Sequence, residues 1–175
     1  CAHAIETTYQ GKHVGTFGDY GCFSFYATKN IVTGEGGMVI VKHKEDNDKI
    51  RILALHGMTA DAWKRFSDEG YKHYQVVCPG FKCNMMDIQA ALGIHQLKRV
   101  DRNLQRRGKI WQKYNESFAD LNITLPSAPA PEIKHAYHLY TILIDKDKVG
   151  ISRDEFLSAM HRENIGIGVH YLSIP

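Results

Sequence analysis

The sequence contains little that would favour a membrane, a secretory route or a nucleic-acid surface. No apolar run approaches the roughly 18 residues that a membrane span needs. The opening residues, CAHAIETTYQGKH, lack the basic stretch followed by an apolar stretch that marks a secretory signal peptide. The formal net charge is only +3, and such a mild excess does not favour nucleic-acid binding. We therefore expect a cytoplasmic protein that binds neither nucleic acid nor a membrane.

Cysteine is scarce and shows no pairing or metal-binding pattern. Four cysteines could form two disulfides, but 175 residues are enough to build a hydrophobic core without them. Reduced thiols in a cytoplasmic protein are the favoured interpretation. None of the ten histidines stands near cysteines or carboxylates at a metal-ligand spacing, so we predict no metal site. Gly34, Gly36 and Gly37 do not form the G-x-G-x-x-G fingerprint of a dinucleotide site.

The two ends of the sequence are typical of internal positions in a longer polypeptide. The chain begins without methionine, inside an amphipathic stretch. It ends on Ser-Ile-Pro, directly after an apolar strand-like run. We therefore expect a fragment of a longer protein, or the ordered part of one.

Hydrophobic patterning predicts a mixed α/β organisation in the first half. Short strands are expected at 20–26, which is rich in aromatic residues, and at 38–41, a β-branched run typical of a buried strand. A helix with an acidic first turn is expected over 45–55. Residues 57–83 combine glycines, Pro79 and scattered aromatics, and predict a long ordered loop of the kind often used for function.

The second half begins with a predicted long helix. One apolar stripe, whose members are three, four or seven residues apart, predicts a single helix over 87–121, with its basic side chains on a solvated face. The Pro-rich segment 126–132 is expected to separate this helix from a smaller unit. That unit is predicted to contain a strand at 136–144, a helix from Ser152 to near Asn164, and a strand over IGIGVHYL at 165–172. Ser152 and Glu155 form the S-x-x-E capping box of that helix.

Lys29 most needs an explanation, because it lies between an aromatic strand-like run and a glycine-rich turn. The ordinary interpretation is a lysine whose amine extends into water from a strand end. The context offers another interpretation, since Ser24 precedes it and a hydroxyl near a turn can bind a phosphate oxygen. A desolvated lysine amine can form a Schiff base. An amine and a phosphate anchor this close together are what pyridoxal phosphate requires.

Four segments together resemble the DegT/DnrJ family of sugar aminotransferases, which are pyridoxal-phosphate enzymes of fold type I. They are CAHAIETTYQGKHVGTFGDYGCFSF at the start, SFYATKNIVTGEGG around the lysine, PGFKCNMMDIQAALGIHQL at the long helix, and IGIGVHYLSIP at the end. These segments cover nearly the whole chain. Within the family, the run RILALHGM followed by DAW is most similar to aminotransferases that make 4-amino-4-deoxyarabinose or similar 4-amino sugars on a carrier.

The resemblance implies cofactor-binding roles for four residues. Lys29 matches the catalytic lysine, which bonds the cofactor and then moves the proton during amino transfer. Ser24 matches the hydroxyl on the cofactor phosphate, and His3 matches the residue that lies against the cofactor ring. Taken alone, His3 would more often be a partly buried structural histidine. Asn84 lies in the segment that reaches the neighbouring subunit's phosphate, although the family's G-x-N-x-R is replaced here by GFKCN.

Three further residues match substrate-binding positions of the family. His138, His170 and Tyr171 correspond to positions near the sugar and its diphosphate. His138 also alternates with apolar neighbours, so a core histidine is the other interpretation. Asn84 likewise has another interpretation, as a residue of the helix N-cap region before Asp87.

The resemblance also places part of the cofactor site upstream of Cys1. The aspartate that pairs with the pyridine nitrogen would stand just before this residue, and the phosphate-binding loop and the stacking aromatic would lie further upstream. We therefore expect an isolated chain of this length to bind the cofactor poorly, because the aspartate keeps the pyridine protonated.

The resulting expectation for the fold is α/β: the later part of the large domain of a type I pyridoxal-phosphate transferase, plus the start of its small α+β domain. Residues 1–94 would belong to the large domain, 95–125 to a long connecting helix, and 126–175 to the small domain.

The expected function is transfer of an amino group, with glutamate as donor, to a nucleotide-linked ketosugar for surface polysaccharide or lipopolysaccharide synthesis. A homodimer with shared active sites is expected. A dehydratase of the same family would have histidine in place of Lys29. The remaining alternatives are a non-catalytic regulatory or binding member and an inactive dimerising fragment.

Overall fold

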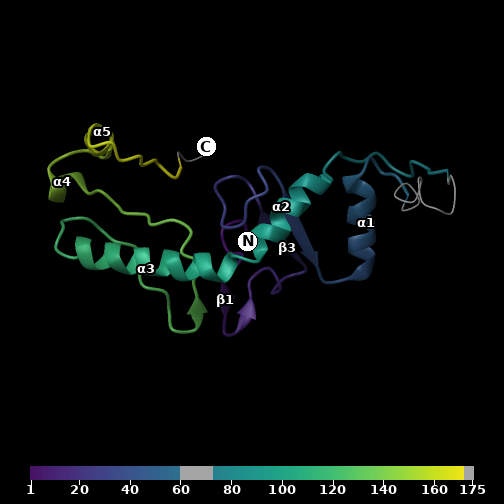
Figure 1. Cartoon of the computed structure of the whole chain (residues 1–175), viewed down its shortest axis with the longest axis horizontal. Helices are drawn as coiled ribbons and strands as arrows, with labels where there is room; N and C mark the ends of the chain where they lie inside the picture. Colours follow the sequence, from purple (N-terminus) through teal and green to yellow (C-terminus); the bar gives the residue numbers. More distant parts are fainter. Residues whose placement is uncertain (60–72, 172–175) are drawn as a thin grey trace. The chain divides into compact units, whose positions relative to one another are not determined.

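The computed structural model describes residues 1–59 and 73–171, which form two compact units. The first unit contains the described residues of 1–105 and 129–138, and the second contains those of 106–128 and 139–171. Figure 1 shows the chain path and the element labels. The helix α3 (Val100–Phe118) contributes residues to both units.

An antiparallel hairpin lies at the centre of the first unit. β3 (Tyr20–Ser24) pairs with β4 (Gly37–Val41), with Tyr20 opposite Val41 and Ser24 opposite Gly37. The strands expected at 20–26 and 38–41 are therefore confirmed. The expected burial of the second strand is wrong, because Met38 is 55% exposed and its apolar neighbours are exposed too. β4 has β3 as its only strand partner among the described residues.

The connection between β3 and β4 is an ordered loop packed around a small apolar cluster. Phe23, Phe25 and Ile31 form this cluster, with exposures of 9%, 7% and 4%. The Phe25 N–H donates to Gly36 O at 2.8 Å, and the Thr33 N–H donates to Phe25 O at 2.9 Å. These bonds fold the loop back on the hairpin and fix the segment that carries Lys29.

A second small sheet brings the start of the chain beside residues 129–138. Its order is β2–β1–β5, with β1 at Thr8–Tyr9, β2 at Lys12–His13 and β5 at Ile133–Lys134. Gln10 and Gly11 connect β1 and β2 with positive φ angles of 49° and 75°, the requirement of a two-residue hairpin turn. The sequence patterning did not reveal these two-residue strands.

The predicted long helix over 87–121 is wrong, because the structure contains two helices there. α2 spans Asp87–Leu97 and α3 spans Val100–Phe118, with Lys98 and Arg99 between them. The Lys98 N–H donates to Ile94 O and the Arg99 N–H donates to Gln96 O, which closes the last turn of α2. The apolar stripe is continuous in the sequence, but the two helices bury it to different extents. No residue of α2 is buried, whereas Leu104 and Trp111 of α3 are.

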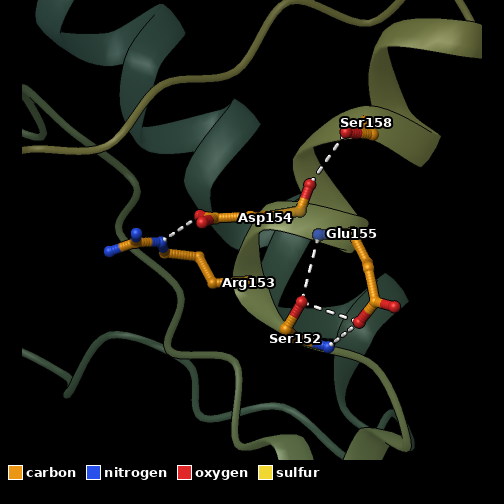
Figure 2. Close-up of polar contacts among 5 residues, drawn as sticks. All are labelled: Ser152, Arg153, Asp154, Glu155 and Ser158. Carbon is orange, nitrogen blue, oxygen red and sulfur yellow. Dashed lines mark hydrogen bonds and ion pairs between the residues drawn. The ribbon is translucent and has the colours of Figure 1, made fainter.

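The other helices match their predicted positions. α1 spans Lys44–Ala54, close to the expected 45–55. α5 spans Arg153–Arg162 and begins at Ser152, whose hydroxyl accepts from the Glu155 N–H while the Glu155 carboxylate accepts from the Ser152 N–H and hydroxyl. Figure 2 shows this capping box, which is therefore confirmed. A short helix, α4, spans Lys146–Val149.

Aromatic packing holds the second unit together. Trp111 is 7% exposed and meets Tyr140 edge-on, with ring centroids 4.8 Å apart. Tyr114 also meets Tyr140 edge-on, and the Tyr140 hydroxyl donates to Asn115 Oδ1 at 2.7 Å. Tyr140 thereby fixes the segment after residue 138 on α3.

Two strands expected in this unit are not formed. Within 136–144, only Leu143 makes a bridge, to Thr124, and no strand is formed over 165–171. A strand requires a hydrogen-bonding neighbour, and apolar alternation alone does not supply one. Residues 172–175 lie outside the described part.

The expected loop over 57–83 is described only at its two ends, since 60–72, which include the DAW motif, lie outside the described part. Gly57 and Gly80 hold these ends together at close range. A Cβ on Gly57 would stand 1.8 Å from Cys78 O, and one on Gly80 would stand 2.2 Å from Gly57 N. Only glycine permits such backbone proximity.

Within residues 1–59 and 73–171, no helix is long and apolar enough to cross a bilayer. The same residues contain no group of three or more histidines, cysteines or acids placed to hold a metal ion. All four cysteines are free thiols.

Candidate functional site

Lys29 lies on a tight turn directly after β3. The Lys29 N–H donates to Tyr26 O at 2.9 Å, the 4→1 hydrogen bond of a β-turn. The side chain is half-buried, and its Nζ lies 2.7 Å from Nε2 of His3. The amine therefore does not simply extend into water, as the ordinary interpretation of a strand-end lysine would require.

Lys29 is one end of a chain of polar side chains. The ring of His3 lies 4.3 Å from the ring of His138, centroid to centroid. His138 Nδ1 is 2.8 Å from Asn30 Oδ1. Asn30 Nδ2 donates to Glu6 Oε2 at 2.8 Å and to Ala136 O at 3.3 Å.

The small sheet explains how these distant residues meet. Thr8 of β1 is opposite Lys134 of β5, so the segments on either side of this pair run beside each other. His3 and Glu6 precede β1, and His138 follows β5. The predicted residues His3, Lys29 and His138 are thus brought together within the first unit.

Ser24 is the last residue of β3, at the base of the same loop. It is partly buried, and its Oγ accepts from the Tyr26 N–H at 3.4 Å. A serine hydroxyl carries two acceptor lone pairs and a rotatable O–H. The hydroxyl can therefore donate to a phosphate oxygen while its contact to Tyr26 remains.

Asn84 precedes α2, which is attached to the Lys29 loop. Gln89 Nε2 donates to Glu35 O at 2.8 Å, and Met85 packs against the Phe23–Phe25–Ile31 cluster. The Asn84 Oδ1 accepts from the Lys82 ammonium. The N-terminus of α2 thus belongs to the same unit as Lys29, and the role of Asn84 toward a neighbouring subunit stays a prediction.

His170 and Tyr171 belong to the second unit. Both are exposed, and their rings are 3.7 Å apart, centroid to centroid. Their predicted contact with substrate stays a prediction.

Two residues of the polar network were not predicted as site residues. Glu6 is only 4% exposed, and Asn30 directly follows Lys29. The sequence offered one weak signal for Asn30, its position beside the lysine. Glu6, between Ile5 and Thr7, gave none, because a lone acid ordinarily indicates a solvated position.

His135 directly follows β5 and stands three residues before His138 in the sequence. Burial lowers the pKa of the His135 imidazole below its ordinary value of 6.5. Its Nδ1 accepts from the Tyr137 N–H at 3.2 Å, which requires an unprotonated Nδ1. Burial and this hydrogen bond both favour the neutral ring.

The chemistry of these side chains fits pyridoxal phosphate. The Lys29 amine can bond an aldehyde carbon, an imidazole at 2.7 Å can exchange a proton with that amine, and the Ser24 hydroxyl can donate to a phosphate. Gly36 allows Thr33 and Met85 to approach the backbone of the Lys29 loop closely. A Cβ at this position would stand 2.5 Å from Thr33 Oγ1 and 2.8 Å from Met85 Cε.

Comparisons with known proteins agree with this chemistry. The chain is 47% identical over 173 residues to the uncharacterised protein MJ1066 of Methanocaldococcus jannaschii, and 45% identical over 174 residues to the spore coat polysaccharide biosynthesis protein SpsC of Bacillus subtilis. Each match covers 99% of this chain and 45% of the relative. The chain thus spans slightly under half the length of these curated relatives.

Solved structures confirm the expected fold class. Spr1654 from Streptococcus pneumoniae, assigned as a sugar aminotransferase, matches in its PMP form with a TM-score of 0.83 and 34% identity, over 98% of this chain and 42% of that one. Helicobacter pylori PseC, an aminotransferase of pseudoaminic acid biosynthesis, matches with a TM-score of 0.84 and 31% identity, over 98% and 44%.

The family model of the DegT/DnrJ/EryC1/StrS aminotransferases matches residues 1–175, the whole sequence. Aminotransferases of this family depend on pyridoxal phosphate. The structure of Spr1654 has been solved in its PLP form and in its PMP form. The fold, the residues around Lys29 and these matches give one conclusion: the chain belongs to the DegT/DnrJ/EryC1/StrS aminotransferase family.

Proposed function

We propose that this chain carries the catalytic lysine of a sugar aminotransferase that transfers an amino group from glutamate to a nucleotide-linked ketosugar. The observation that carries the proposal is the position of Lys29, on a hydrogen-bonded turn with its Nζ 2.7 Å from His3 Nε2. The nature of SpsC and PseC, which act in polysaccharide and pseudoaminic acid biosynthesis, supports a sugar substrate for surface polysaccharide synthesis.

Each residue has a defined task in this proposal. Lys29 Nζ binds the cofactor and, once released, carries the proton at the substrate carbon. The Ser24 hydroxyl and the Asn84 amide hold phosphate oxygens, and the His3 ring lies against the cofactor. Bound pyridoxal phosphate would supply the electron sink for the reaction.

The remaining assignments are proposals of the same kind. His138, His170 and Tyr171 would contact the sugar and its diphosphate. Asn84 would act in the neighbouring subunit of a homodimer in the cytoplasm. Residues 1–94 and 126–175 would belong to the large and small domains, with the connecting segment 95–125 formed by the end of α2 together with α3.

The test is an absorbance titration of the full-length protein with pyridoxal phosphate, beside Lys29→Ala. The proposal expects a visible band of lysine-bound cofactor that Lys29→Ala abolishes, because the bond requires a primary amine. Lys42→Ala is the matched control, since Lys42 is an exposed lysine directly after β4 that forms a salt bridge with Asp19. A wild-type protein without the band, or a band that persists in Lys29→Ala, contradicts the proposal.

A further inference from the structure

The orientation of the Asn30 amide is fixed by its neighbours. Its Nδ2 lies within hydrogen-bond distance of two acceptors, the Glu6 carboxylate and the Ala136 carbonyl. Rotating the amide by 180° would turn its oxygen toward both. The Ala136 carbonyl has no proton to offer, so this rotation would replace an attraction with a repulsion.

The fixed amide determines the protonation of His138. Asn30 Oδ1 faces His138 Nδ1 at 2.8 Å, and an amide oxygen can only accept. Nδ1 must therefore carry a hydrogen. In a neutral imidazole the second nitrogen, Nε2, then holds the lone pair.

The burial of Glu6 makes this arrangement significant. A carboxylate at 4% exposure is costly to keep in a fold unless hydrogen bonds compensate for the loss of water. Here the buried acid holds Asn30, and Asn30 in turn holds a histidine whose ring lies tilted beside that of His3, the residue in contact with the Lys29 amine.

We propose that Glu6 and Asn30 are positioning residues that hold His138 in its Nδ1-protonated form, so that the ring offers Nε2 as an acceptor in the Lys29 site. The use of this acceptor in amino transfer, for example by a sugar hydroxyl, rests on the proposed function. The tautomer of the ring does not.

The experiment measures the His138 tautomer in the full-length protein by nitrogen-15 NMR with labelled histidine, at a pH where the ring is neutral. The His138→Gln variant identifies the signals. Wild type is expected to show a protonated Nδ1. In Asn30→Ala, loss of the acceptor is expected to shift the tautomer ratio toward protonated Nε2 by about three- to tenfold, the effect of one hydrogen bond.

The role of Glu6 is tested separately. Glu6→Gln allows residue 6 to donate as well as accept, so only the Ala136 carbonyl still opposes rotation of the Asn30 amide. A partial shift toward protonated Nε2 is therefore expected. The double variant Glu6→Gln with Asn30→Asp restores an acceptor next to His138 and should restore the wild-type tautomer. Glu35→Gln, an exposed acid of the same loop, should leave the tautomer unchanged.

Four results would overturn the inference. They are a wild-type ring protonated on Nε2, an unchanged tautomer in Asn30→Ala, an unchanged tautomer in Glu6→Gln, and failure of the double variant to restore it. Circular dichroism verifies that each variant is folded, and if Asn30→Ala is not, the single and double Glu6 variants decide. These measurements need neither cofactor nor substrate, so their failure is distinguishable from failure of the absorbance test.

Discussion

Asn30 shows how much one side chain can organise in this molecule. Its three short contacts reach Glu6, Ala136 and His138, and its backbone is bonded directly to Lys29. Any change that moves Asn30 therefore disturbs the acid, the histidine and the lysine turn together. Glu6 and Asn30 are correspondingly sensitive to single replacement, even though neither is assigned a contact with the cofactor.

His135 gives a prediction about pH. Because burial places the pKa of His135 below 6.5 in the folded protein, the unfolded chain takes up the proton first as the pH falls. The contribution of His135 to stability is complete above pH 6.5 and is lost as the pH falls through the folded-state pKa. Urea unfolding at a series of pH values, together with NMR titration of the His135 ring, measures both effects.

The control for this pH prediction is His135→Gln, in which the same loss of stability with falling pH should be smaller. A His135 titration at or above the ordinary histidine value would contradict the prediction.

At the scale of elements, helices and strands were predicted correctly where the signal lies in neighbouring residues. They were predicted wrongly where the structure depends on a distant packing or hydrogen-bonding partner. The α5 capping box and the strands around Lys29 depend on neighbouring residues, so the sequence revealed them. The break at Lys98 and Arg99 depends on what each helix packs against, which an apolar stripe does not encode. The strand predicted over 136–144 does not form for the same reason, because Thr124 is the only bridge partner of Leu143 among the described residues.

The site shows the same division. The predictions for Lys29, Ser24 and His3 rest on recognisable motifs in their segments. Glu6 was not, because its importance arises from a hydrogen bond to Asn30 across 24 residues and from burial by the fold. The pairing of β1 with β5 was not predicted either, because strands of two residues are too short to show an alternating hydrophobic pattern.

The cap of α5 supports a prediction with an internal control. Ser152→Ala removes the hydroxyl that accepts from the Glu155 N–H, and we expect it to destabilise the second unit by about 1 kcal/mol. Ser158→Ala removes a hydroxyl that donates to Asp154 O inside the same helix, as Figure 2 shows, and should have little effect. Thermal unfolding measures both, and equal effects would contradict the capping argument.

At the scale of the whole molecule, the two units differ in how much apolar surface they bury. The buried apolar side chains among the described residues are Phe23, Phe25, Ile31, Leu104, Trp111 and Ala136, and only Trp111 belongs to the second unit. A unit with little buried apolar area opens more readily, since burial supplies most of the favourable free energy of folding.

We therefore predict unequal hydrogen exchange between the units. Backbone amides of β3 and of the loop around Ile31 should exchange at least tenfold more slowly than those of α5, a ratio that corresponds to about 1.4 kcal/mol in opening free energy. Exchange followed by mass spectrometry on the same sample measures this ratio. Uniform protection across both units would be the contrary result.

The contacts of Asn30 also have a consequence for the order of events during synthesis. Its bond to His138 spans 108 residues, and its bond to Glu6 spans 24. On a ribosome, Lys29 leaves the exit tunnel long before the residues that complete its surroundings. Closing so long a stretch of chain is slow and entropically costly. The lysine segment of a nascent chain is therefore unfinished until residue 138 has emerged, however early the β3–β4 hairpin forms.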